Sequence, residues 1–208
     1  MLHLKLASKA ASIIQDLQNY GYSVTPNLLA PDMVTALVGD VRALQDQGAF
    51  LPAAVGRTDQ RRHLSEVRSD QTYWLGTRQP ESPAVLAVLN FIEILKNELN
   101  RQLFLGLWDF EGHYAIYPSG GFYQRHRDRF SDSDLRTVSV VLYLNQFWNP
   151  ACGGELVIYR HSNPVETVAP MAGTLVTFLS SDIEHEVRKS YAERVSLAGW
   201  LRRRGSSC

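Results

Sequence analysis

The second half of the chain consists of short apolar segments that turn signals separate at close intervals. The clusters PSGG, NPACGG, HSNP and PMAG punctuate it, and glycine, proline and asparagine in such clusters favour turns between strands. The predicted strands are 113–118, 121–126, 137–145, 154–160, 164–170, 173–180, 184–189 and 194–203. Short strands at this spacing predict a two-sheet jelly roll or a cupin-like barrel.

The first half of the chain carries helical patterns. Apolar residues recur at helical spacing within residues 4–19, and the segment that follows reads as a short strand and turn. A second helix is predicted to begin at Pro31 and to stop at Gly48, and the strongest helix follows Ser82 as its N-cap. Helices followed by strands predict an α+β domain whose N-terminal helices pack on one sheet.

Length and composition favour a single domain over residues 1–208, with 1–110 as mainly helical support and substrate loop and 111–203 as the barrel core. The chain is 45% hydrophobic and 20% charged, which suits a globular domain with a substantial core. Lysine plus arginine and aspartate plus glutamate both number 21, so no overall field would attract nucleic acid or an anionic membrane. The first residues do not resemble a signal peptide, and no apolar run is long enough to cross a membrane. We expect a cytoplasmic monomer.

His126 and Asp128 lie two residues apart in the stretch 117–130, which around them reads as a strand. Side chains at this spacing point to the same side of a strand, so both can converge on one object. That object is a metal ion, a proton-transfer pair or a simple hydrogen bond, and this pair alone does not decide between them. His185 follows in the segment SSDIEHEV, and Arg194 begins the last predicted strand.

Two histidines and one carboxylate form a facial triad, which leaves three coordination positions of an iron ion open. A 2-oxo acid and dioxygen can fill these positions. The far carboxylate of 2-oxoglutarate then needs a partner, and a guanidinium meets a carboxylate in bidentate geometry. We predict that Arg194 has this role, with the phenol hydroxyls of Tyr143 and Tyr117 completing the hydrogen bonds.

Several motifs together resemble one family. The segments YPSGGFYQRHRD, RTVSVVLYLNQFW, GGELVIY, GTLVTFLSSDIEHEV and ERVSLAGWLRR, with VRSDQTYWL and NRQLFLGLWDFEGHYAIYP upstream, are similar to the 2-oxoglutarate- and Fe(II)-dependent prolyl hydroxylases. The likeness is strongest to the bacterial relatives of the hypoxia-inducible-factor prolyl hydroxylases and covers most of residues 20–203. Ser69 and Ala198 depart from the family's pattern, which has glycine and threonine at these places.

This resemblance implies a double-stranded β-helix core, with Fe(II) held by His126, Asp128 and His185. It implies 2-oxoglutarate held by Arg194, Tyr143 and Tyr117, dioxygen as the second cosubstrate, and ascorbate as a reductant. It implies a protein substrate with an exposed prolyl residue, elongation factor Tu among the candidates. The substrate residues that the resemblance implies are Tyr123, Arg136, Trp200, Arg68, Asp70 and Trp74.

Two alternatives to a protein hydroxylase stay open. The same chemistry can act on a free amino acid or another small molecule, and a cupin-like binding module can keep the triad as a structural metal site. The stretch 49–67 has no clear period and includes Arg57, Arg61 and Arg62. It reads either as a solvated loop or as a loop that closes over a protein substrate, and its length favours a macromolecular substrate. His113 reads as a core or hydrogen-bonding histidine.

Overall fold

The computed structural model describes residues 2–53, 66–77, 81–129 and 135–205. Arg57, Arg61 and Arg62 lie outside the described residues, so the prediction of a substrate loop there is not tested. The described chain has the α-helices α1 (Leu2–Tyr20), α2 (Pro31–Asp46) and α3 (Pro83–Leu103). The Ser82 hydroxyl accepts a hydrogen bond from the Val85 amide and caps α3, which confirms the predicted start of this helix.

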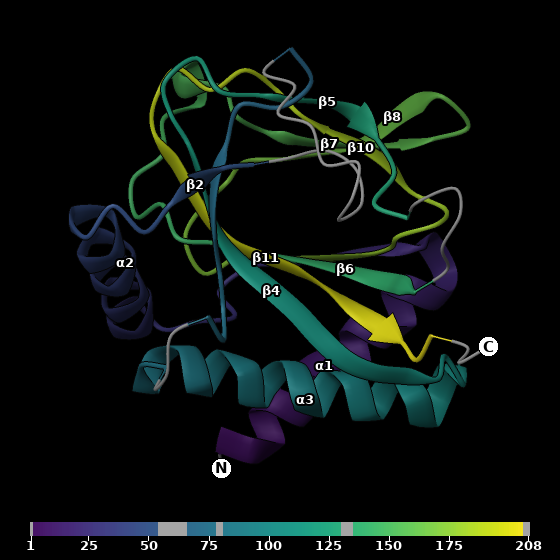
Figure 1. The fold of residues 1–208 in the computed structure, drawn as a ribbon. Helices are drawn as coiled ribbons and strands as arrows, with labels where there is room; N and C mark the ends of the chain where they lie inside the picture. The colour runs from purple at the N-terminus through teal and green to yellow at the C-terminus, as the bar shows by residue number, and fades with distance from the viewer. Residues whose placement is uncertain (1, 54–65, 78–80, 130–134, 206–208) are drawn as a thin grey trace.

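The strands form two facing sheets, as the sequence predicts (Figure 1). The larger sheet has, in spatial order, β1 (Tyr22–Thr25), β9 (Leu175–Leu179), β6 (Arg136–Tyr143), β11 (Arg194–Arg203), β4 (Leu107–Tyr117), β3 (Gln71–Trp74) and β2 (Leu51–Pro52). The smaller sheet has β5 (Tyr123–His126), β10 (Glu184–Val187), β7 (Leu156–Arg160) and β8 (Asn163–Val168). This arrangement is the double-stranded β-helix fold.

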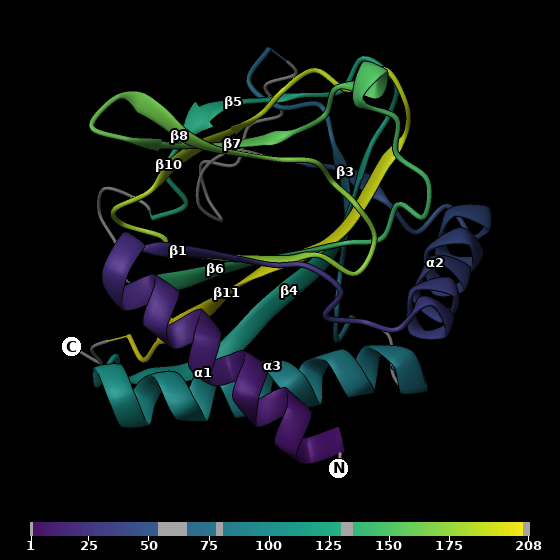
Figure 2. The ribbon, with the colours of Figure 1, turned by 180° about the vertical axis from the view of Figure 1, so that it is seen from behind.

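The helices cover the outer face of the larger sheet, where α1 and α3 cross each other (Figure 2). Ile13 and Leu17 of α1 and Leu95 of α3 are buried there with Tyr114 and Leu197 of the sheet. A second apolar cluster lies between the two sheets and includes Val176, Phe178 and Ile158. Because side chains alternate along each strand, one face of the larger sheet packs on helices and the other faces the second sheet. No described helix is long and apolar enough to cross a membrane.

Two features of the larger sheet differ from the sequence prediction. β4 begins at Leu107, not at His113, and its first half pairs with the end of β11. The charged residues Asp109 and Glu111 break the apolar alternation by which a strand is predicted from sequence. The strand tolerates them because they pair with Arg202 across the ladder at 2.7 and 3.0 Å. β2 and β3 extend the same sheet. β2 lies within 49–67, to which the sequence analysis gave no regular structure, and β3 was not predicted as a strand.

Gly112 and Gly199 lie opposite each other where β4 and β11 pair. A Cβ atom on Gly199 would press on the carbonyl oxygen of Glu111 and lie 2.6 Å from the Phe110 ring. Both neighbours belong to the packed sheet, so neither can move away cheaply. Gly39 of α2, by contrast, has nothing within 4 Å of its Cβ position.

We therefore expect opposite effects from the same substitution at these two glycines. Gly199→Ala should lower the free energy of unfolding by about 1–3 kcal/mol, because it overpacks the sheet. Gly39→Ala should raise it by about 0.5–1 kcal/mol, because alanine loses less backbone entropy in a helix. Urea unfolding followed by tryptophan fluorescence measures both. Equal stability of Gly199→Ala and the wild type would show that the two strands are not packed as described.

Candidate active site

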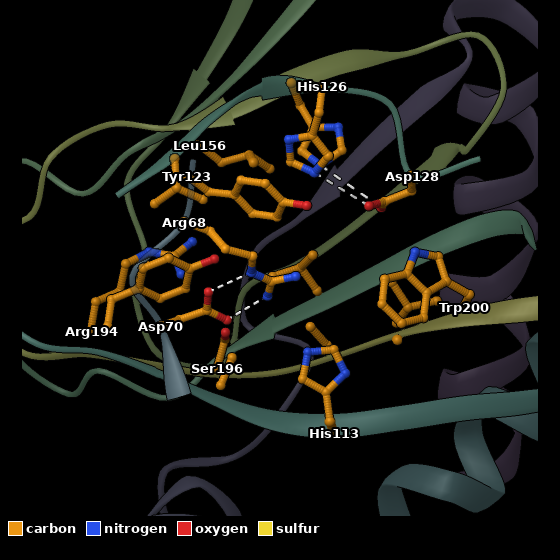
Figure 3. A pocket seen from close by; sticks show the side chains of 18 residues that line it. Arg68, Asp70, His113, Tyr123, His126, Asp128, Leu156, Arg194, Ser196 and Trp200 are labelled. Carbon is orange, nitrogen blue, oxygen red and sulfur yellow. Dashed lines mark hydrogen bonds and ion pairs between the residues drawn. The ribbon is translucent and has the colours of Figure 1, made fainter. Parts of the chain in front are cut away.

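His126, Asp128 and His185 converge on one place in the cavity, and Figure 3 shows His126 and Asp128 facing each other there. His126 ends β5 and pairs in register with His185 of β10, while Asp128 lies two residues beyond the end of β5. His126 Nε2 and His185 Nε2 lie 3.5 and 3.8 Å from the carboxylate oxygens of Asp128. One ligand atom from each residue lies within 4.8 Å of the other two, which is close enough for a single metal ion.

A hydrogen bond from the ring of His126 directs the ring's unshared electron pair inward. His126 Nδ1 donates to the Gln124 carbonyl oxygen at 2.7 Å, so the lone pair of this imidazole is on Nε2, which faces Asp128. That buried Nε2 has no hydrogen-bond partner among the described residues. Two acceptors that face each other repel unless a cation lies between them, so the donor set fits a metal ion. Ser139 donates to Asp128 Oδ2 at 2.7 Å and fixes the carboxylate.

The local electrostatics keep His185 neutral and Asp128 ionised at neutral pH. Burial, followed by the neighbouring His126, lowers the pKa of His185 to about 4. Burial alone would raise the pKa of Asp128, but the imidazoles of His185 and His126 and the Ser139 hydroxyl together hold it well below its usual range. Metal ligands must be deprotonated. Two imidazole nitrogens and one carboxylate that leave positions open are the ligand set of non-haem Fe(II) oxygenases.

Arg194 lies in the same cavity, away from the triad. The side chain is 1% exposed, and its Nε donates to the Gly154 carbonyl oxygen at 2.9 Å. The terminal amino groups are therefore the part of the guanidinium that can donate to a carboxylate. The Tyr117 and Tyr143 ring centroids lie 4.9 and 5.0 Å from its central carbon.

The two tyrosines beside Arg194 are neutral donors. Burial raises the pKa of both phenols above the ordinary value. Tyr117 lines the cavity with Arg194, and the ring of Tyr143 packs beside the guanidinium without itself lining the cavity. The buried hydroxyl of Tyr143 has no hydrogen-bond partner within the described part of the chain. A cation flanked by phenol donors can bind one end of a dicarboxylate.

Three of the predicted substrate residues, Tyr123, Arg68 and Asp70, form the wall near the triad. Tyr123 stacks on His126 with 3.6 Å between ring centroids, and the Arg68 guanidinium lies 4.4 Å from the Tyr123 centroid. Arg68 makes two hydrogen bonds to Asp70, of 2.7 and 2.6 Å. Burial lowers the pKa of Arg68, but its bonds and charge interaction with Asp70 outweigh burial, so that the net shift is upward. This pair is held as a neutral unit.

Trp200 lines the opposite side of the cavity, and Arg136 packs on Trp200 without lining the cavity itself. The Arg136 guanidinium lies 3.4 Å from the Trp200 ring centroid, and Arg136 pairs with Glu111 at 3.4 Å. Trp200 lines the cavity. Trp74 does not line it, and packs with a centroid distance of 6.2 Å behind Trp200. Trp74, which was predicted to bind the substrate, therefore supports Trp200 and does not itself face the cavity.

The sequence analysis missed two polar groups at this site. Ser139 is buried and bonded to Asp128, and it interrupts the apolar run of β6, which was a usable signal. His113 was read as a core or hydrogen-bonding histidine, yet it lines the cavity. It lies in phase with Ala115 and Tyr117 along β4, and this alternation would have placed it on the cavity face.

The fold and the site define a mononuclear non-haem iron oxygenase that takes a 2-oxo acid. The sequence profile described as the 2OG-Fe(II) oxygenase superfamily matches residues 112–202. A Pseudomonas putida prolyl-4-hydroxylase structure is 41% identical, with a TM-score of 0.84 over 94% of this chain and 100% of that chain. The chain belongs to the 2-oxoglutarate- and Fe(II)-dependent oxygenases, in the group of the prolyl hydroxylases.

More distant relatives match along the same length. A Trichoplax adhaerens prolyl hydroxylase, in complex with a hypoxia-inducible-factor oxygen degradation domain peptide fragment, is 27% identical with a TM-score of 0.86, over 97% of this chain and 92% of that chain. The hypoxia-inducible factor prolyl hydroxylase of Caenorhabditis elegans is 26% identical, and human Egl nine homolog 1 is 27% identical, each over 95% of this chain. The chain spans 28% and 47% of the lengths of these two relatives.

Loss of a histidine ligand should remove metal binding. We expect His126→Ala and His185→Ala each to weaken Mn(II) binding by at least about 100-fold, since loss of an outer partner of a ligand already costs about 10–100-fold. Electron paramagnetic resonance of free Mn(II) measures the affinity. His161→Asn is the control: it removes an exposed histidine and keeps a residue that tolerates the positive φ of 47° there. Wild-type affinity in either alanine variant would contradict the triad assignment.

Replacement of Arg194 by lysine tests the anion site. Arg194→Lys should weaken 2-oxoglutarate binding by about 10–100-fold, because an ammonium cannot reproduce the parallel bonds of a guanidinium. Calorimetric titration of the Mn(II)-loaded protein measures this. Arg202→Lys is a matched control on the same strand, since Arg202 binds Asp109 with two bonds at the surface. Equal affinity in Arg194→Lys and the wild type would mean that the carboxylate binds elsewhere.

Proposed function

We propose that this protein hydroxylates a prolyl residue of a protein substrate. In the balanced reaction, 2-oxoglutarate loses carbon dioxide and becomes succinate, one oxygen atom of dioxygen enters succinate, and the other enters the prolyl ring. The observation that carries the proposal is one cavity that holds both the triad and the buried cation Arg194. A structural metal site would not need that cation, so the binding-module alternative has no use for Arg194.

The residues of this chain have separable tasks in this proposal. His126, Asp128 and His185 hold Fe(II), which supplies the activation of dioxygen when it is bound. Arg194 binds the far carboxylate of 2-oxoglutarate, with donors from Tyr117 and Tyr143. Such placement in a buried site excludes water and orients the reactants.

The wall near the triad suits a prolyl ring. Trp200 offers a flat apolar surface that Arg136 holds from one side, and Tyr123 closes against His126. Arg68 and Asp70 neutralise each other, so this wall does not present the separate charges that a free amino acid would require. These features favour a residue within a peptide over a free amino acid.

For the protein partner we propose bacterial elongation factor Tu, a cytoplasmic protein. The 41% identity with a bacterial prolyl-4-hydroxylase along the whole of that chain supports a bacterial type of substrate. The Trichoplax relative, which is in complex with a peptide fragment, supports a peptide segment as the form in which the proline enters.

The test is a mass measurement on three kinds of substrate. The enzyme is incubated with Fe(II), 2-oxoglutarate and ascorbate, together with intact elongation factor Tu, peptides that tile its prolines, or free L-proline. We expect the protein and one peptide to gain one oxygen atom, while L-proline stays unchanged. Oxidation of L-proline alone would establish the small-molecule alternative, and succinate formation without any oxidised product would leave the protein substrate unsupported.

A further inference from the structure

His113 lies on the cavity face of β4, on the wall opposite the triad (Figure 3). The residue is 4% exposed, and its buried Nδ1 has no hydrogen-bond partner within the described residues. A polar group in this state costs about 1–3 kcal/mol. Native structures rarely keep such a group without a ligand or water to bind it.

The position of His113 along β4 separates it from the 2-oxoglutarate end. Tyr117 is opposite Arg194 in the ladder and His113 is opposite Ala198. Four residues along a strand span about 13 Å, which is longer than a five-carbon diacid. A group bound at His113 therefore lies far from the anion site and close to Trp200, the ring assigned above to the prolyl residue.

Ring packing holds the imidazole in one orientation. The Trp74 centroid lies 4.8 Å from that of His113, and the Trp200 centroid lies 5.5 Å from it. Trp74 pairs with His113 in register from the neighbouring strand β3. A ring packed between two indoles cannot rotate freely, so its nitrogens are positioned before a ligand arrives.

The imidazole is neutral at physiological pH. Burial, followed by the neighbouring charge of Arg68, lowers the pKa of His113 to about 4. A neutral imidazole has one donor and one acceptor nitrogen. The neighbouring Trp200 adds an indole Nε1, a donor that is also buried and without a partner in the described chain. Together the two rings match a neutral group that both donates and accepts, and this is the chemistry of a peptide amide.

We propose that His113, together with Trp200, binds the main-chain amide next to the target proline and so selects a peptidyl proline. This inference rests on the function proposed above, because it assigns the substrate contact of that same cavity. Free proline has a carboxylate and an ammonium in place of these amides, and neither is the best partner for a neutral donor and acceptor pair. His113 is thus a specificity-determining residue.

The test compares two variants of His113 with the wild type. His113→Phe keeps an aromatic ring and removes both nitrogens, whereas His113→Gln keeps a donor and an acceptor. With the elongation factor Tu peptide that the wild type oxidises, we expect the KM of His113→Phe to rise about 3–10-fold, which corresponds to one lost hydrogen bond. Its kcat and its affinity for 2-oxoglutarate should stay at wild-type values, and His113→Gln should recover most of the peptide affinity.

The outcomes separate this inference from the proposed function. If the wild type oxidises the peptide and His113→Phe has the same KM, His113 does not bind substrate, and the proposed function stands. If both variants lose peptide and 2-oxoglutarate affinity together, or unfold at a lower temperature to the same extent, the histidine has a structural role and the inference falls. If the wild type oxidises only L-proline, the proposed function fails and the inference fails with it.

Discussion

The pairing of β4 with β11 is the interaction on which the rest of the structure depends. The ladder runs from Arg194 opposite Tyr117 to Arg203 opposite Leu107, and β6 pairs with the other edge of β11. Side chains alternate along a strand, so a slip of one residue in this register would turn Arg194 and His113 away from the cavity. The same register brings Ser139 beside Trp200. Because Ser139 donates a hydrogen bond to Asp128, this pairing connects the carboxylate of the triad to the substrate wall.

The helical layer lets one sheet serve two purposes. Tyr114 and Ile116 of β4 face the apolar cluster under α1 and α3, while the alternate residues Ala115 and Tyr117 face the cavity. Burial of the helix side offsets the cost of keeping polar groups on the other face. The described site can therefore hold several unpaired nitrogen and oxygen atoms without loss of the fold.

Four of the unpaired atoms lie at the places assigned to ligands. His126 Nε2 faces the metal position, the Tyr143 hydroxyl lies beside the anion site, and the nitrogens of His113 and Trp200 lie in the substrate wall. Each is buried and without a partner in the described chain, and each such group costs stability until a ligand binds it. The cavity is thus preorganised: the chain orders its polar groups during folding, and binding does not have to order them again.

The sequence by itself determined the three helices, the run of strands from β4 to β11, the grouping of His126, Asp128 and His185, and Arg194 as a cation beyond them. Residue types and local periodicity carry this information, because a helix cap or an alternating strand depends on near neighbours. The sequence did not show that β4 starts at Leu107, that Trp74 packs behind the wall, or that His113 faces the cavity without a partner. Pairing between distant strands decides these features, since burial and the lack of a hydrogen bond exist only once the sheets have met.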